Sequence, residues 1–84
     1  MMRFTVTWHP EAEDELAELW ISAEDRDAIT AAVQAIDTAL RSDASAKGEA
    51  VAENLRAFHA FPLRVLFVAR ESDRVVQIEM IRRI

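Results

Sequence analysis

The sequence has no cysteine and no tyrosine, and it has only one glycine and two prolines. Without cysteine, neither a disulfide framework nor a thiolate zinc site can form, and His9 and His59 are too few for a zinc cluster. The scarcity of glycine and proline argues against a disordered or loop-rich chain. It also excludes a glycine-rich phosphate loop. We therefore expect a folded domain without a metal or cofactor.

Long apolar runs are also absent. None approaches the roughly 20 residues that a membrane-spanning helix needs, and no signal peptide is visible. We therefore expect a cytoplasmic protein without a membrane partner. The 84 residues predict a single domain, residues 1–84, with one core. A domain of this size buries only roughly 60% of its unfolded surface, so we expect a marginal stability that a bound partner would raise.

The net charge of −5 is divided unevenly along the chain. Residues 11–27 contain eight acidic residues and one arginine, whereas residues 55–84 contain six arginines and three acidic residues. An acidic chain is a poor general binder of nucleic acid, because phosphate neutralisation supplies most of that affinity. The arginine-rich half can still form a local anion site. The acidic half can dock a basic partner, although a solvated helix face is the commoner reason for such a run.

The first 23 residues predict a strand followed by a helix. Phe4, Val6 and Trp8 alternate with polar residues, which is the pattern of a half-buried strand. A helix then begins at Pro10, whose fixed φ suits the first helical position, and ends near residues 21–23. Its apolar positions recur at helical spacing and include Trp20. We expect Trp8 and Trp20 in the core, since both lie on the predicted buried faces.

A second helix follows directly. Ser22 is the expected N-cap, with acidic residues in the first turn. The apolar stripe of this helix is narrow and has the spacing of one helical face: Ile29, Val33, Ile36 and Leu40. The short connection between the two helices predicts a helical hairpin.

The second half of the chain predicts three strands. Residues 42–48 are small and polar and predict a connection back to the sheet. Residues 50–52 are compatible with a helix, and a strand is expected at about 54–60. Two apolar runs, residues 63–70 and 74–82, flank a polar break of turn length and predict a β-hairpin. The element order is β-α-α-β-β-β, which predicts an α+β fold with a helical hairpin on a mainly antiparallel four-stranded sheet.

Arginines are the main candidates for chemistry. Arg64 alternates with the apolar residues of its strand and therefore projects from the opposite face of the sheet, where Arg56 is expected beside it, while Arg82 and Arg83 end the last strand. Such a cluster can bind phosphate bidentately and stabilise charge during phosphoryl transfer. The commoner alternative is a structural one, in which Glu79 pairs with Arg64 or Arg56 across the sheet.

The two histidines are weaker candidates. His59 is a candidate general base because it is a histidine, but a lone histidine beside a proline turn is more often a surface residue. His9 precedes Pro10 and is expected to begin the first helix. No Ser/His/Asp set has a recognisable spacing, so a conventional hydrolase is not predicted.

The element order and four segments together resemble the RelE/ParE toxin superfamily of type II toxin–antitoxin modules. The segments are FTVTWHPEAEDELAELW (4–20), NLRAF (54–58), PLRVLFVAR (62–70) and DRVVQIEMI (73–81). The resemblance covers nearly the whole chain and rests on the placement of strands and arginines. It implies a growth-inhibiting toxin, of the kind linked to plasmid stabilisation. It also implies a cognate antitoxin that fills a groove beside the helical hairpin with an extended or helical segment.

The resemblance is compatible with two functional branches of the superfamily and with a third alternative. In the RelE-like branch, which cleaves mRNA on the ribosome, a strand arginine binds phosphate, and Arg64 matches it. A further arginine matches Arg82 or Arg83, with Arg56 as a neighbour. That branch usually adds a C-terminal tyrosine or histidine and a basic surface, whereas this sequence is acidic and has no tyrosine.

These differences place the chain closer to the ParE-like branch, which poisons DNA gyrase and needs no nuclease site. A relative that has lost its activity is the third alternative. A homodimer and a heterotetramer with the antitoxin are both compatible with this class of protein.

Overall fold

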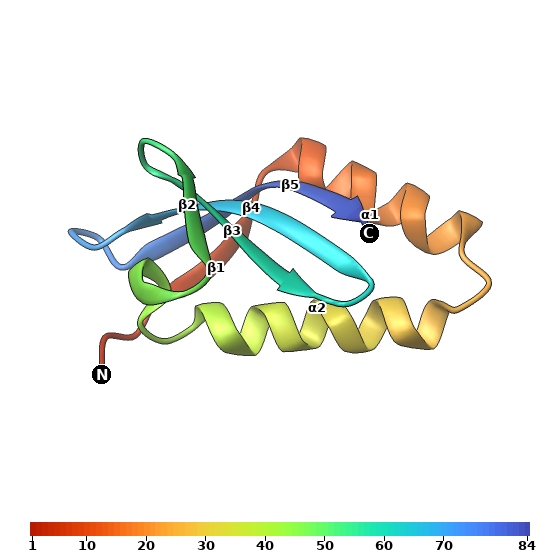
Figure 1. Cartoon of the computed structure of the whole chain (residues 1–84), viewed down its shortest axis with the longest axis horizontal. Coiled ribbons are helices and arrows are strands. Elements are labelled where there is room, and N and C mark those ends of the chain that lie inside the picture. The colour runs from red at the N-terminus through yellow and green to blue at the C-terminus, as the bar shows by residue number, and fades with distance from the viewer.

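The computed structural model describes residues 1–84 as two helices packed on one side of a five-stranded sheet (Figure 1). In chain order the elements are β1 (Thr5–Trp8), α1 (Pro10–Ser22), α2 (Arg26–Leu40), a short 3-10 turn η1 (Ala44–Ala46), β2 (Glu49–Ala52), β3 (Leu55–Ala60), β4 (Leu63–Arg70) and β5 (Val75–Arg83). The strand order is β1-β5-β4-β3-β2. All neighbours are antiparallel except β1 and β5, which are parallel. The predicted α+β fold is confirmed.

The strand β1 and the start of α1 follow the predicted pattern. Phe4 is buried, and Val6 and Trp8 pack against the core. Pro10 is the first residue of α1, and His9 is its N-cap, where the imidazole Nδ1 accepts a hydrogen bond of 3.1 Å from the backbone N–H of Glu11. This bond satisfies one of the N–H groups that a helix leaves free at its start. His9 therefore has a structural role at the beginning of α1.

The boundary between the helices differs from the prediction. Asp25, not Ser22, is the N-cap of α2. Ser22 is the last residue of α1, and its hydroxyl donates a hydrogen bond of 2.8 Å to the carbonyl of Glu18. A serine in a last helical turn can bond to the preceding turn in this way, which removes it from the N-cap role.

The sheet has five strands, where the sequence predicted four. The additional strand is β2, an edge strand whose four residues are all exposed. Residues 50–52, which were compatible with a helix, therefore form a strand. Its pairing with β3 depends on Gly48, which has a φ of +64°, because a Cβ there would lie 1.9 Å from the carbonyl oxygen of Ala57. Glycine is the one residue without that atom.

The core lies between the helices and the central strands. Leu63, Val65 and Phe67 of β4 are completely buried and meet buried residues of α2 and β5, such as Ile36 and Ile78. Helix α1 packs along β5, whereas α2 packs on β3 and β4. Because the two helices rest on different strands, their facing sides remain apart, and this separation creates the first candidate site.

Candidate functional site

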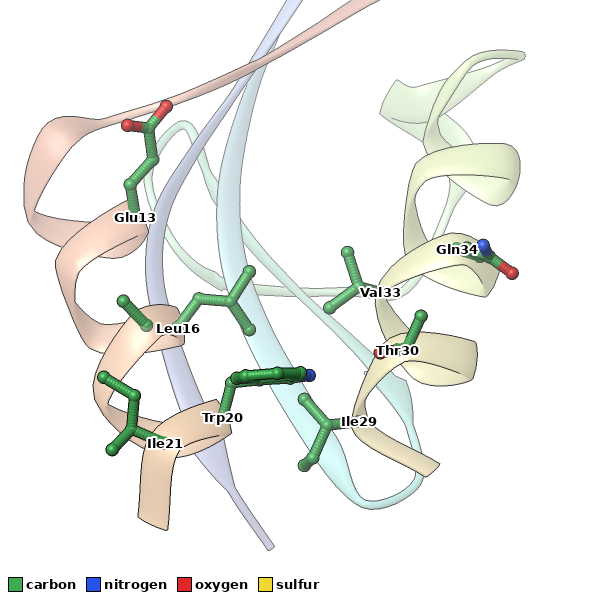
Figure 2. Close-up of a pocket in the computed structure, with 9 residues that line it drawn as sticks. Glu13, Leu16, Trp20, Ile21, Ile29, Thr30, Val33 and Gln34 are labelled. Atoms are coloured by element: carbon green, nitrogen blue, oxygen red, sulfur yellow. The ribbon is translucent and has the colours of Figure 1, made fainter. Parts of the chain in front are cut away.

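An apolar groove of about 700 Å³ lies between α1 and α2. In Figure 2, Leu16 and Trp20 point from α1 towards α2, while Ile29 and Val33 approach them from α2. The complete set of lining residues is Glu13, Leu16, Ala17, Trp20, Ile21, Ile29, Thr30, Val33 and Gln34. Most of these side chains are apolar; Ile29 belongs to the core, whereas Trp20 and Ile21 are exposed.

Trp20 was predicted to be a core residue, and this prediction is wrong. The residue is 44% exposed, and its ring forms part of the groove wall. Helical periodicity identifies an apolar face but not whether a neighbouring helix closes over it. Here α1 and α2 rest on different strands, so α2 does not cover the face of α1 that carries Trp20 and Ile21.

Arg26 lies at the C-terminal end of α1, beside Trp20. Its guanidinium donates hydrogen bonds of 2.9 and 2.8 Å to the carbonyls of Trp20 and Ile21. The same group lies 4.7 Å from the centroid of the Trp20 ring. A cation at a helix C-terminus is stabilised by the free carbonyls there, and a cation over indole is attracted by its π face. Arg26 therefore both caps α1 and orients the tryptophan.

The end of β5 anchors α1 and the connection between the helices through two ion pairs. Arg82 pairs with Glu15, whose carboxylate also accepts a weak hydrogen bond of 3.5 Å from the backbone N–H of Ile81. Arg83 donates two hydrogen bonds, of 3.0 and 2.6 Å, to the two carboxylate oxygens of Asp25. These hydrogen bonds lower the pKa of Asp25 below its ordinary value and raise the pKa of Arg83.

A second candidate site lies on the face of the sheet that points away from the helices. Strand register places His59 directly opposite Arg64, and Arg64 directly opposite Arg82. Directly opposite residues share a face, with Cβ atoms roughly 5 Å apart. The three residues therefore form a row across β3, β4 and β5, which we call the basic row. Two of the four predicted arginines are brought together there, and His59 joins them.

Arg56 and Arg83 do not belong to the basic row. Arg56 was expected on the same face as Arg64, but its register partner is Phe67, which points into the core. Its guanidinium instead donates hydrogen bonds of 2.8 and 3.1 Å to the carbonyls of Lys47 and Gly48, where it supports the turn into β2. Arg83 is opposite Leu63 and is held by Asp25 on the helix side.

The predicted pairing of Glu79 with Arg64 or Arg56 is also wrong. The register of β4 and β5 shifts between Leu66 and Phe67, and Glu79 is the residue that this bulge leaves without a partner in β4. None of the four ion pairs in the structure involves Arg64 or Arg56. Arg64 is thus a half-buried arginine with no acidic partner.

No group of three or more His, Cys, Asp and Glu side chains is placed to hold a metal ion. Neither helix has the length and apolar character required to cross a membrane.

The comparisons with known proteins concern the fold. No model of a known protein family matches the sequence, and no curated protein sequence matches it. The toxin–antitoxin complex RelBE2 from Mycobacterium tuberculosis contains a chain with a TM-score of 0.78 and 16% identity, over 100% of this chain and 94% of that chain. The chromosomal ParDE TA system from P. aeruginosa gives a TM-score of 0.69 and 18% identity, over 100% and 99%. At these identities the likeness shows the fold alone, and it confirms the RelE/ParE-like fold that the resemblance implied.

Proposed function

We propose that this chain is the toxin component of a type II toxin–antitoxin system and that a cognate antitoxin neutralises it. The observation that carries the proposal is the open apolar groove between α1 and α2. It occurs in a chain whose fold matches, over its whole length, chains of two toxin–antitoxin complexes. An apolar groove of this kind marks a protein–protein contact.

The groove also explains why a partner would stabilise the chain. Trp20 and Ile21 are 44% and 68% exposed, so a partner that covers them removes apolar surface from water. A small domain has a low free energy of unfolding. A ligand that binds only the folded state raises this free energy substantially. This is the thermodynamic relation expected between a toxin and its antitoxin.

For the target, we propose a protein such as DNA gyrase, inhibited by binding. The chain carries a net charge of −5, which opposes general binding to RNA. The basic row contains one side chain suited to proton transfer, His59, and one of its two arginines is already paired with Glu15. A toxin that acts by binding needs neither feature.

A second candidate function is a ribosome-dependent mRNA endoribonuclease, and the basic row favours it. Arg64 has no acidic partner and shares a face with His59 and Arg82. A guanidinium in such a row can stabilise a phosphorane-like charge, and an imidazole can transfer the proton. In this alternative Arg64 and His59 are the residues whose loss abolishes activity.

Inducible expression in bacterial cells tests the proposal and separates the two candidates. We expect growth arrest accompanied by a DNA-damage response while translation continues. Arg64→Ala should leave the arrest unchanged, as should the matched control Arg70→Ala, which removes an exposed arginine outside the basic row. Rapid loss of translation that Arg64→Ala abolishes and Arg70→Ala does not would establish the endoribonuclease. The absence of any arrest by the wild-type chain would contradict both functions.

A further inference from the structure

Strand β5 extends beyond its edge neighbour β1, and helix α1 lies beside the extension (Figure 1). The pairing of β1 with β5 ends where Trp8 faces Ile78, so residues 79–83 have no strand on that side. The chain turns there into α1, and the backbone N–H of His9 donates a hydrogen bond of 2.8 Å to the carbonyl of Ile78. The end of β5 therefore faces a helix and not a strand.

Glu15 makes the polar contact between α1 and this part of β5. Its carboxylate pairs with the guanidinium of Arg82 and accepts the weak hydrogen bond from the backbone N–H of Ile81. Arg82 Nη1 also donates a hydrogen bond of 2.9 Å to the carbonyl of Ile81. The two side chains together bind both main-chain polar groups of Ile81, which an unpaired strand edge would leave free. This arrangement directs the guanidinium of Arg82 towards α1.

Arg64 is the residue that Arg82 would join in the absence of this contact. The two arginines are directly opposite on β4 and β5, which places their Cβ atoms roughly 5 Å apart on one face of the sheet. Arg64 takes part in no ion pair. Two guanidinium groups at this spacing can bind the oxygens of one phosphate-type anion. Glu15 is a competing acceptor for one of the two groups.

The contact between Glu15 and Arg82 is weak enough to be exchanged. The two side chains are 33% and 53% exposed, and ion pairs as exposed as this one contribute little to stability. The arginine side chain is also long and rotatable, so its guanidinium can turn from α1 towards Arg64 without a movement of the backbone. The carboxylate of Glu15 is the group that favours the first of these two positions.

We infer that Glu15 is an autoinhibitory residue, which occupies Arg82 and thereby suppresses the binding of a phosphate-type anion between Arg82 and Arg64. The inference goes beyond the proposed function, because it concerns a property of the folded chain that does not depend on a toxin role. It agrees with the expectation that Arg64→Ala leaves the growth arrest unchanged, since Arg64 without a second free arginine is a weak anion site.

The test is a titration of the purified full chain with inorganic pyrophosphate at low ionic strength, followed by the NMR signals of the arginine Nε–H groups. Glu15→Gln removes the charge and keeps the shape of the side chain. We expect it to tighten binding about fivefold, the factor that corresponds to the loss of one exposed ion pair. The control Glu18→Gln removes a carboxylate that lies beside Arg82 without a hydrogen bond to it. It should tighten binding by less than about twofold.

A double variant shows whether the anion lies between the two arginines. Adding Arg64→Ala to Glu15→Gln should abolish the gain in affinity, whereas adding Arg70→Ala, outside the basic row, should preserve it. Equal gains from Glu15→Gln and Glu18→Gln would reduce the effect to general charge, and that result would overturn the inference. No gain from Glu15→Gln, or a gain that survives Arg64→Ala, would overturn it as well. Growth arrest is not measured, so a failure of this test is distinct from a failure of the proposed toxin function.

Discussion

The groove and the basic row lie on opposite sides of one sheet. They differ in how many of the features needed for their proposed roles are present. The groove has a mostly apolar lining, a tryptophan oriented by Arg26, and one acidic residue, Glu13. The basic row has an unpaired arginine, but Glu15 holds Arg82, and His59 is the only group there suited to proton transfer. The comparison supports the proposal that this chain acts by binding a protein.

The largest expected effect comes from the core that supports both regions. Phe67 is completely buried between the helices and the sheet, and truncation of a buried phenylalanine costs about 3–5 kcal/mol. Phe67→Ala should therefore unfold much of the protein at growth temperature and remove both sites together. Chemical denaturation followed by circular dichroism measures this. Leu66→Ala, on the half-buried opposite face of the same strand, should cost clearly less.

A smaller loss of stability is expected at the C-terminal end of α1. Arg26→Ala removes the two hydrogen bonds to the carbonyls of α1 and the contact with Trp20, and we expect a loss of about 1 kcal/mol. Arg26→Lys should recover only part of it, because an ammonium lacks the planar fork. Denaturation monitored by tryptophan fluorescence reports both stability and the ring environment. Arg41→Ala, which breaks an exposed pair with Asp37, is the control and should cost less.

A substitution in the basic row is expected to increase the stability of the protein. Arg64 and Arg82 are directly opposite, and like charges in that arrangement destabilise a sheet. Arg64→Thr should therefore raise the free energy of unfolding by about 0.2–1 kcal/mol, as measured by urea denaturation. A fall in stability would mean that Arg64 has a structural role and would weaken the case for a functional row.

The smallest expected effect is the pH dependence of the stability that the ion pair between Asp25 and Arg83 contributes. The hydrogen bond from Arg83 lowers the pKa of Asp25 in the folded state below the ordinary value of 3.8. The stabilisation is therefore present above pH 3.8 and is lost as the pH falls through the lowered pKa. The stability difference between the wild type and Asp25→Asn should shrink over that acidic range. In an Arg83→Ala background, Asp25→Asn should show no such trend.

Much of the fold could be predicted because local patterns specify it. The alternation of Phe4, Val6 and Trp8 predicts β1, and Pro10 marks the start of α1. The apolar run of β4 is predicted to the residue. The last strand begins one residue later than predicted, because Arg74 has a φ of +54° and belongs to the turn.

The parts that could not be predicted depend on tertiary contacts. The sequence of β2 has no strand pattern, and it becomes a strand because Gly48 allows a close approach to β3. Arg56 was placed on the wrong face because the register of β3 against β4, which no local pattern fixes, sets it opposite Phe67. Trp20 was assigned to the core because an apolar helix face looks the same whether it is covered by the chain or by a partner.

The most direct test of the central claim is the affinity of the chain for its antitoxin, which we expect to be the product of an adjacent small gene. We predict that Trp20→Ala raises the dissociation constant at least about 30-fold, the equivalent of roughly 2 kcal/mol for a central aromatic contact. Phe61→Ala, at the turn beside the basic row, should leave the constant within about twofold, because a contact outside the interface core contributes little. Equal effects of the two variants, or a larger effect of Phe61→Ala, would contradict the assignment of the groove as the antitoxin site.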